Sequence, residues 1–318
     1  MSNIEILSAV HGIAPRSNEL LRLGTDLDRG RVEQEVYDEQ LASETAAWLD
    51  LQTEAGIDIR EDGKLGWHNH LQPIVTFSNG FSPNIDEGPL TRWFNDNRFF
   101  RQPAIIGRLS LNYDYVTQQL GTLGDNVSLL SPSSFANLCD DRYPELPAER
   151  NVLQLYADLF FYFEQNGVKR VLLEDYLPST VQREDSLHYV KSLVDWNAGL
   201  HISLISPSNQ VAIPRPVDPR LGIGIEARTL RYISTQPDYV KLDFNHAEIW
   251  HQVIDASDTK NDDLEPSKFP IDLFESLSPV RLILTHSVDL ECLPLKYAQD
   301  KVKHLGEFVS NVRERVAA

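Results

Sequence analysis

Histidines and carboxylates gather in short segments that follow predicted β-strands. His68 and His70 lie two positions apart, so in an extended segment both imidazoles would face the same side. Glu174 and Asp175 end a run of apolar residues at 170–174. Histidine titrates near neutral pH, and a carboxylate can accept a proton or orient a substrate. These residues are therefore candidates for acid–base catalysis, and the histidines are also candidate ligands or members of a solvated loop.

A second constellation consists of His201, Asp243 and His286, which lie on or after three later predicted strands. Two imidazoles and one carboxylate can hold iron(II) in a facial triad, or zinc through nitrogen and oxygen ligands. The spacing carries no metal signature, and a histidine in an apolar strand is also compatible with a core position. We predict a metal site from this set, and we place His201 and Asp243 among the catalytic candidates beside Glu174 and Asp175.

Further polar and aromatic residues follow the other predicted strands and are candidates for binding a substrate. They are Arg16, Lys64, Trp67, His68, His70 and Asn97. Cationic side chains suit an anionic substrate, for example a carboxylate or a folate tail. The alternative for each arginine is an ordinary surface position.

Short β-rich runs alternate with amphipathic helical runs along the chain. These strands and helices must position the candidate residues. The predicted strands are Glu5–Val10, Ile57–Ile59, Ala104–Leu111, Val127–Leu130, Arg170–Glu174, His201–Ile205, Tyr239–Asp243 and Arg281–Thr285. The predicted helices are Val32–Glu54, Leu153–Gln165, Asp185–Asn197, His246–Asp255 and Leu295–Arg315. About eight strand–helix units predict an α/β protein, a single (β/α)8 TIM barrel over residues 1–318, with its site at the strand ends. A doubly wound sheet is the alternative, but residues 10–15 lack a GxGxxG turn.

Composition excludes several classes of function. The 318 residues contain 29 Lys+Arg and 47 Asp+Glu, a net charge of −18, which disfavours nucleic acid and anionic membranes as partners. Two cysteines cannot build a disulfide scaffold, a four-thiolate cluster or a Cys₄ zinc module. The first residues lack the basic start and apolar run of a signal peptide. We therefore expect a cytoplasmic protein that acts on a small molecule, and the sequence leaves its oligomeric state open.

Several segments, in this order, resemble the catalytic domain of the cobalamin-independent methionine synthase family in its short form. They are Gly12–Arg16, the stretch from Glu35 through Gln52 to Gly63, Arg92–Asn97 followed by Pro103, Gly167–Asp175, and Leu293–Lys301. The resemblance covers nearly the whole chain. It implies a barrel of the methionine synthase and uroporphyrinogen decarboxylase type. It also implies methyl transfer from a folate donor, methyltetrahydrofolate, or from a corrinoid donor.

The same resemblance shows where this chain departs from the family. The family's zinc holds the homocysteine thiol through a His-x-Cys pair, a glutamate and a later cysteine. Asp243 stands at the glutamate position, and the segments at 201–205 and 286–290 contain no cysteine. Lys64 replaces a family glutamate, so it should repel the ammonium group of homocysteine.

We therefore predict a divergent methyltransferase whose acceptor is not zinc-activated homocysteine. Zinc or iron in a site without thiolates remains open. One alternative is another enzyme on the same barrel, either metal-dependent through histidine and carboxylate or of the decarboxylase or lyase type. The other is a non-catalytic binding protein that has lost the site.

Overall fold

The computed structural model describes residues 4–84, 88–92, 99–176, 183–197, 199–205, 220–225, 248–260 and 262–317. Contacts divide the chain into two compact units. The first unit comprises Met1–His68 and Gly224–Ala318, and the second comprises Asn69–Ile223.

The first unit contains a parallel sheet with strand order β1-β12-β11. These strands are β1 (Glu5–Ser8), β12 (Arg281–His286) and β11 (Glu248–Ile254). Leu7, Ile283 and Trp250 align across it, and an isolated parallel bridge joins Ala9 to Ile59. Both faces of β12 are buried, which explains its nearly continuous apolar sequence.

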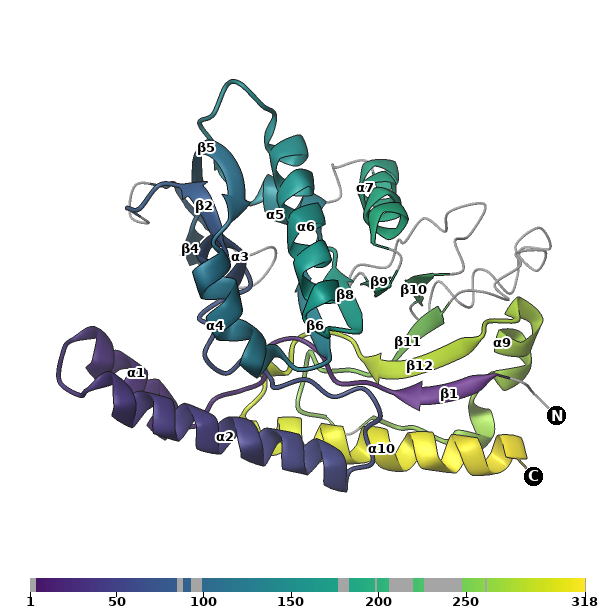
Figure 1. The fold of residues 1–318 in the computed structure, drawn as a ribbon. Helices are drawn as coiled ribbons and strands as arrows, with labels where there is room; N and C mark the ends of the chain where they lie inside the picture. Colours follow the sequence, from purple (N-terminus) through teal and green to yellow (C-terminus); the bar gives the residue numbers. More distant parts are fainter. Residues whose placement is uncertain are drawn as a thin grey trace. The chain divides into compact units, whose positions relative to one another are not determined.

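The first unit also contains helices. They are α1 (Asn18–Asp28), α2 (Gln34–Glu54), α9 (Ile271–Leu277) and α10 (Leu295–Ala317), with 3₁₀ turns η3 (Pro266–Lys268) and η4 (Leu290–Cys292). The C-terminal end of α2 lies against the middle of α10 (Figure 1), and α10 contacts β1, β12 and β11. Buried residues of α10 recur every three or four positions, as in Ala298, Val302, Leu305 and Val309. This period directs one side of α10 toward the strands.

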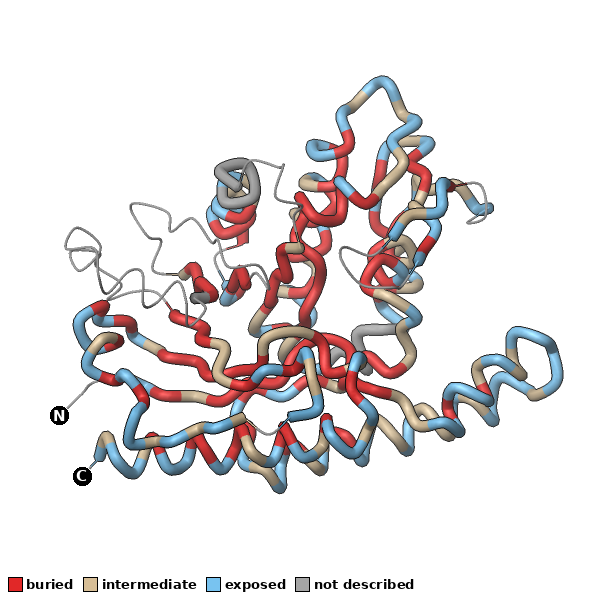
Figure 2. The backbone as a smooth tube through the Cα atoms, turned by 180° about the vertical axis from the view of Figure 1, so that it is seen from behind, coloured by how far each residue is buried: buried red, intermediate tan, exposed pale blue. Residues whose placement is uncertain are grey.

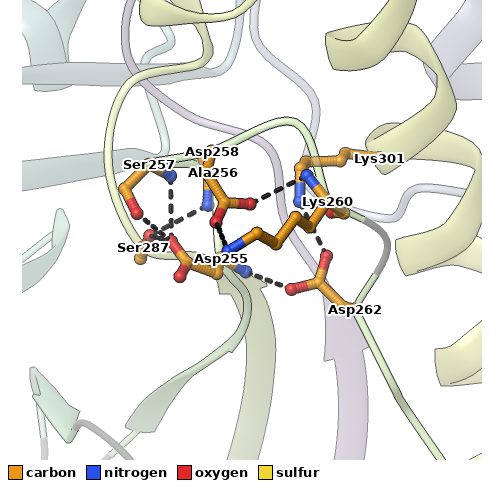
Figure 3. A network of polar contacts seen from close by, with 8 residues as sticks. All are labelled: Asp255, Ala256, Ser257, Asp258, Lys260, Asp262, Ser287 and Lys301. Atoms are coloured by element: carbon orange, nitrogen blue, oxygen red, sulfur yellow. Dashed lines mark hydrogen bonds and ion pairs between the residues drawn. The ribbon is translucent and has the colours of Figure 1, made fainter.

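A polar network ties the loop after β11 to α10 (Figure 3). The Lys301 ammonium donates to the Lys260 carbonyl oxygen at 2.9 Å and pairs with Asp262 at 2.9 Å. Asp262 also accepts the backbone N–H of Asp255, whose carboxylate accepts the Ser287 hydroxyl. Lys301 is buried, so its charge is balanced inside the protein.

The second unit contains a parallel sheet with strand order β6-β8-β9-β10. These strands are β6 (Asn126–Leu130), β8 (Arg170–Glu174), β9 (His201–Ile205) and β10 (Leu221–Ile225). In a separate sheet, β5 (Ala104–Leu111) pairs antiparallel with β2 (Ser78–Phe81) and parallel with β7 (Asp140–Asp141). A two-stranded ribbon joins β3 (Leu90–Arg92) and β4 (Phe99–Arg101).

Among its described residues, the second unit contains five helices. They are α3 (Gln72–Thr76), α4 (Tyr113–Leu123), α5 (Pro132–Asn137), α6 (Ala148–Gln165) and α7 (Arg183–Trp196). The apolar face predicted for α6, Leu155, Leu159 and Phe163, is fully buried. Figure 2 shows that in each unit the strands consist mainly of buried residues, whereas exposed residues lie on the outer sides of the helices.

Several predicted elements need correction. Residues 248–254, predicted as helix, form β11, because Ile249, Trp250, Val253 and Ile254 favour an extended strand that is buried on both faces. Ile57–Ile59 contributes only the single bridge to Ala9. Ala104–Leu111 is a strand, but it pairs with β2 outside the parallel sheet. The strand predicted at 239–243 lies outside the described residues.

The α/β class with parallel strands is confirmed, as are the long helices α2, α6, α7 and α10. Closure into one eight-stranded barrel over 1–318 stays a prediction. Within the part of the chain that the structure describes, no helix is long and apolar enough to cross a membrane.

Candidate functional site

Glu174 is the last residue of β8 and is only 1% exposed. Parallel pairing aligns it with Leu130 at the end of β6 and with Ile205 at the end of β9. The Ser131 N–H donates to the Glu174 carbonyl oxygen at 2.8 Å, and the Asp175 N–H donates to the Ile205 carbonyl oxygen at 2.8 Å. These bonds fix the backbone at the carboxyl edge of the sheet, so the main chain that carries the Glu174 side chain is held in place.

Asp175 organises the loop beside Glu174. Its Oδ1 accepts the hydroxyls of Ser131 and Ser134, both at 2.7 Å. Ser134 in turn accepts the backbone N–H of Tyr176 at 2.8 Å. Asp175 is buried, so these hydroxyl donors compensate for the water that its carboxylate has lost. Its position suits a residue that orients its neighbours.

His70 completes a polar cluster at the end of β8. It is 2% exposed, and its Nδ1 lies 3.8 Å from Glu174 Oε2. The Tyr176 hydroxyl donates to the same carboxylate oxygen at 3.4 Å, and the rings of His70 and Tyr176 lie 6.0 Å apart. Asn69 sets this position, because its side chain accepts the N–H groups of Leu71 and Gln72 at the start of α3. A buried imidazole, a buried carboxylate and a half-buried phenol thus lie close together.

The two predicted histidines of residues 67–70 do not share a face. His68 is exposed and His70 is buried, because this segment is bent rather than extended. Of the pair, His70 is the one that the structure places beside another candidate residue, Glu174.

In the first unit, Lys64 forms a buried ion pair with Glu61. The two side chains are 2% and 4% exposed, and the Lys64 ammonium lies 5.4 Å from the centre of the Trp67 ring. Gln52 holds the backbone of Glu61 by accepting its N–H and donating to its carbonyl oxygen. The predicted repulsion of an ammonium group by Lys64 therefore needs correction, because Glu61 balances the lysine charge.

The turn before Lys64 requires glycine. Gly63 has φ +73°, and a Cβ there would lie 2.7 Å from the Trp48 ring and 2.8 Å from the Ala14 methyl. Lys64 also has a positive φ of 48°, which is uncommon for a residue other than glycine. The ion pair thus stands on a tightly constrained backbone.

His286, at the end of β12, forms a stacked pair with His11, whose ring centre lies 4.2 Å away. Its Nδ1 lies 2.9 Å from the Val288 carbonyl oxygen, and its Nε2 accepts the backbone N–H of His11 at 3.2 Å. Burial, helped by His11, holds the pKa of His286 well below its usual value of 6.5. Since Nε2 accepts and Nδ1 donates, this neutral imidazole serves a structural role rather than the predicted role of metal ligand.

Arg16 and Asp289 lie nearby in the first unit, also with internal partners. The Arg16 guanidinium pairs with Glu291 at 3.0 Å, and Asp289 accepts the Ile13 N–H at 2.9 Å. Trp250 is fully buried, and its indole nitrogen has no hydrogen-bond partner among the described residues.

His201 needs correction as a site residue. It is the first residue of β9 and is exposed, opposite Arg170 at the amino end of β8. Four residues of strand, about 13 Å, separate that end from the end that carries Glu174. Asp243 and Asn97 lie outside the described residues. The predicted set of His201, Asp243 and His286 is therefore not brought together by the described residues.

The residues present do not fit the thiolate-bound zinc of the resembling family. Val288 and Asp289 occupy the segment where that family has its later cysteine. Cys139 lies in the second unit, where burial raises the pKa of its thiol and disfavours the thiolate that binds metal. Cys292 is an exposed residue of η4.

Several residues of these clusters were missed in the sequence. They are Glu61, Ser131, Ser134, Trp250 and Asp289. Ser131 before Pro132 is a signal for a helix N-terminus directly after a strand, which could have placed it near Glu174. Glu61 lies three positions before Lys64, a spacing that allows an ion pair.

The structure is that of an α/β protein with buried acid–base groups at the carboxyl ends of parallel strands, the class that includes barrel enzymes. No family model matches the chain. A methionine synthase from Thermococcus kodakarensis is 21% identical over an alignment of 331 residues, which covers 98% of this chain and 94% of the relative.

Two solved structures match nearly the whole chain. One, from Listeria monocytogenes and described as a vitamin-B12-independent methionine synthase, has a TM-score of 0.71 and 13% identity and covers 97% of this chain and 98% of its own. The other is a B12-independent methionine synthase from Shewanella sp. W3-18-1 in complex with selenomethionine. It has a TM-score of 0.70 and 11% identity, and the match covers 100% of this chain and 99% of the Shewanella chain. The chain is therefore similar over nearly its whole length to methionine synthases, two of them described as B12-independent, in agreement with the resemblance found in its sequence.

Proposed function

We propose that this protein is a methyltransferase that moves a methyl group from a folate or corrinoid donor to a small acceptor other than zinc-activated homocysteine. The relationship to methionine synthases supports the reaction class. The cysteine positions support the different acceptor, since neither thiol lies where that family binds zinc.

One observation carries this proposal: the contact of the buried His70 and Glu174 with the half-buried Tyr176 at the end of β8. In barrel enzymes the catalytic residues stand at such strand ends. An acceptor that is not held as a metal thiolate must lose a proton when it attacks the methyl group. A buried imidazole 3.8 Å from a carboxylate can take that proton, because the carboxylate stabilises the imidazolium that forms.

The other residues have supporting roles in this proposal. Asp175 orients the Glu174 loop through Ser131 and Ser134. Arg16 pairs with Glu291, and Lys64 pairs with Glu61. Each cation is therefore balanced by a carboxylate, and neither adds a net positive charge for binding a substrate. Asp243 and Asn97 remain candidates from the sequence, and a closed barrel over 1–318 is part of the proposal.

The test uses methyltetrahydrofolate and methylcob(III)alamin as donors with a panel of small thiol, amine and carboxylate acceptors that includes homocysteine. Tetrahydrofolate or cob(I)alamin formation is measured for the wild type, His70→Asn and Glu174→Gln. We expect acceptor-dependent turnover that falls about 100-fold or more in both variants, the usual effect of losing an acid–base group. Glu149→Gln, an exposed position on α6, is the matched control and should keep wild-type turnover.

Two outcomes would contradict the proposal. One is the absence of any binding of either donor at millimolar concentration by calorimetry, which would favour the non-catalytic alternative. The other is turnover with homocysteine alone that both site variants leave unchanged.

A further inference from the structure

We propose that His70 and Glu174 bind a divalent first-row transition-metal ion through nitrogen and oxygen, with Tyr176 as the adjacent oxygen donor. This inference rests on the proposed function only for the place of the site: an ion on His70 Nδ1 would lower the pKa of a bound acceptor in place of the imidazole base, and the evidence for the ion is the geometry of the second unit alone. The ligand set contains no thiolate and differs from the histidine set predicted from the sequence.

The separation of the two donor atoms is the first argument. The 3.8 Å between His70 Nδ1 and Glu174 Oε2 is too long for a hydrogen bond. Zinc–nitrogen and zinc–oxygen distances of about 2.0–2.2 Å place two ligands of one tetrahedral ion about 3.3–3.5 Å apart. A shift of a few tenths of an ångström would therefore let both atoms bind one ion.

The support around the ligands is the second argument. Metal ligands are held in place by hydrogen bonds from neighbouring groups. Here the backbone around Glu174 is fixed by bonds from Ser131 and Asp175, and the Tyr176 N–H is fixed by Ser134. Asn69 fixes the turn that carries His70. The donor atoms thus stand on rigid elements, as a metal site requires.

The donor chemistry is the third argument. Imidazole and carboxylate suit zinc, iron(II), manganese(II) and cobalt(II), whereas calcium prefers an all-oxygen shell. Both ligands are almost fully buried, so a cation bound between them would interact with the Glu174 carboxylate in a medium of low dielectric constant. The few protein donors would leave positions for water or a substrate, as in catalytic rather than structural sites.

The experiment measures metal binding without any donor or acceptor of a methyl group. Untagged protein is freed of metal with a chelator and titrated with Zn²⁺ by competition calorimetry, for the wild type, His70→Ala and Glu174→Gln. The controls are His188→Ala, an exposed histidine of α7, and Glu149→Gln. We expect a single strong site in the wild type and in both controls, and affinity reduced about 100-fold or more in the two site variants.

A second readout guards against variants that merely fold poorly. Co²⁺ is substituted for Zn²⁺, and its visible absorption is recorded for the wild type and for Tyr176→Phe. A change in the Co²⁺ spectrum of that folded variant, with the urea midpoint unchanged, supports a site next to Tyr176. Zn²⁺ affinity that is equal in the wild type, His70→Ala and Glu174→Gln would overturn the inference, as would a wild type that binds no ion.

The two proposals fail in distinguishable ways. Zn²⁺ binding that depends on His70 and Glu174, without methyl transfer to any acceptor, overturns the proposed function and leaves the metal site standing. Methyl transfer by protein that binds no metal overturns the metal site and leaves the proposed function standing.

Discussion

The buried charges of the two units are arranged differently. In the first unit, Lys64 pairs directly with Glu61, and Arg16 pairs with Glu291. In the second unit, His70 and Glu174 stand 3.8 Å apart, beyond hydrogen-bond distance, although both are buried. Lys64 and Glu61 thus form a close ion pair, whereas the imidazole and carboxylate of the second pair lie at a distance close to that between two ligands of one metal ion.

This difference teaches that burial of a charged residue does not by itself identify a functional site. Lys64 is as deeply buried as His70, and it follows the same kind of strand-end segment. The two residues differ in contact distance: Lys64 is in direct contact with Glu61, so a ligand at Lys64 would have to displace a close ion pair. We therefore assign a structural role to the first pair and a functional role to the second.

The largest effect is expected from breaking the first pair. Lys64→Met leaves Glu61 as a buried charge without its partner, which should reduce the free energy of unfolding by about 3–5 kcal/mol. The double variant Glu61→Leu/Lys64→Met removes both charges and should recover most of that loss. Urea denaturation measures both. If the free energy of unfolding of Lys64→Met lay within about 1 kcal/mol of the wild type, the Lys64–Glu61 pair would not have the structural role that distinguishes it from His70 and Glu174.

A smaller effect is expected from the network shown in Figure 3. Lys301→Met leaves Asp262 and the Lys260 carbonyl oxygen without the ammonium, at a cost of about 1–3 kcal/mol. Amide hydrogen exchange should accelerate in residues 255–260, which this lysine ties to α10. Unchanged exchange in that loop would show that Lys301 does not hold it.

The pH dependence of stability should reveal the neutral His286. Its folded pKa is lowered, so the unfolded chain binds the proton more readily, and stability falls as the pH drops below about 6.5. The slope from this residue is at most about 1.4 kcal/mol per pH unit. Compared with the wild type, His286→Asn should show a flatter dependence of the urea midpoint between pH 5 and 7. Identical slopes would mean that folding leaves the pKa of His286 unchanged.

Much of the fold could be predicted from the sequence because periodicity is a local property. The long helices α2, α6 and α10 carry apolar residues at helical spacing, and the buried strands β6, β8 and β12 are short apolar runs. The wrong prediction of a helix at β11 has a physical cause. Ile249 and Val253 lie four positions apart, a spacing that also fits one face of a helix, and the pairing with β12 makes the segment a strand.

The site was only partly predictable, because it depends on contacts between distant residues. Glu174 and His70 were identified by residue type and by their positions after predicted strands, and the structure places them together. His201 was assigned by the same argument, but it begins its strand instead of ending it. The balance of Lys64 by Glu61 depends on the turn at Gly63, whose geometry residue types alone do not give.

The most direct test of the central claim is a paired urea denaturation of Glu61→Gln and Glu174→Gln at neutral pH. Both variants replace a buried carboxylate by its neutral isostere. We predict a loss of about 3 kcal/mol or more for Glu61→Gln, which leaves Lys64 unbalanced, and a change within about 1 kcal/mol for Glu174→Gln. Equal losses in the two variants would contradict the account, because Glu174 would then be a structural charge like Glu61.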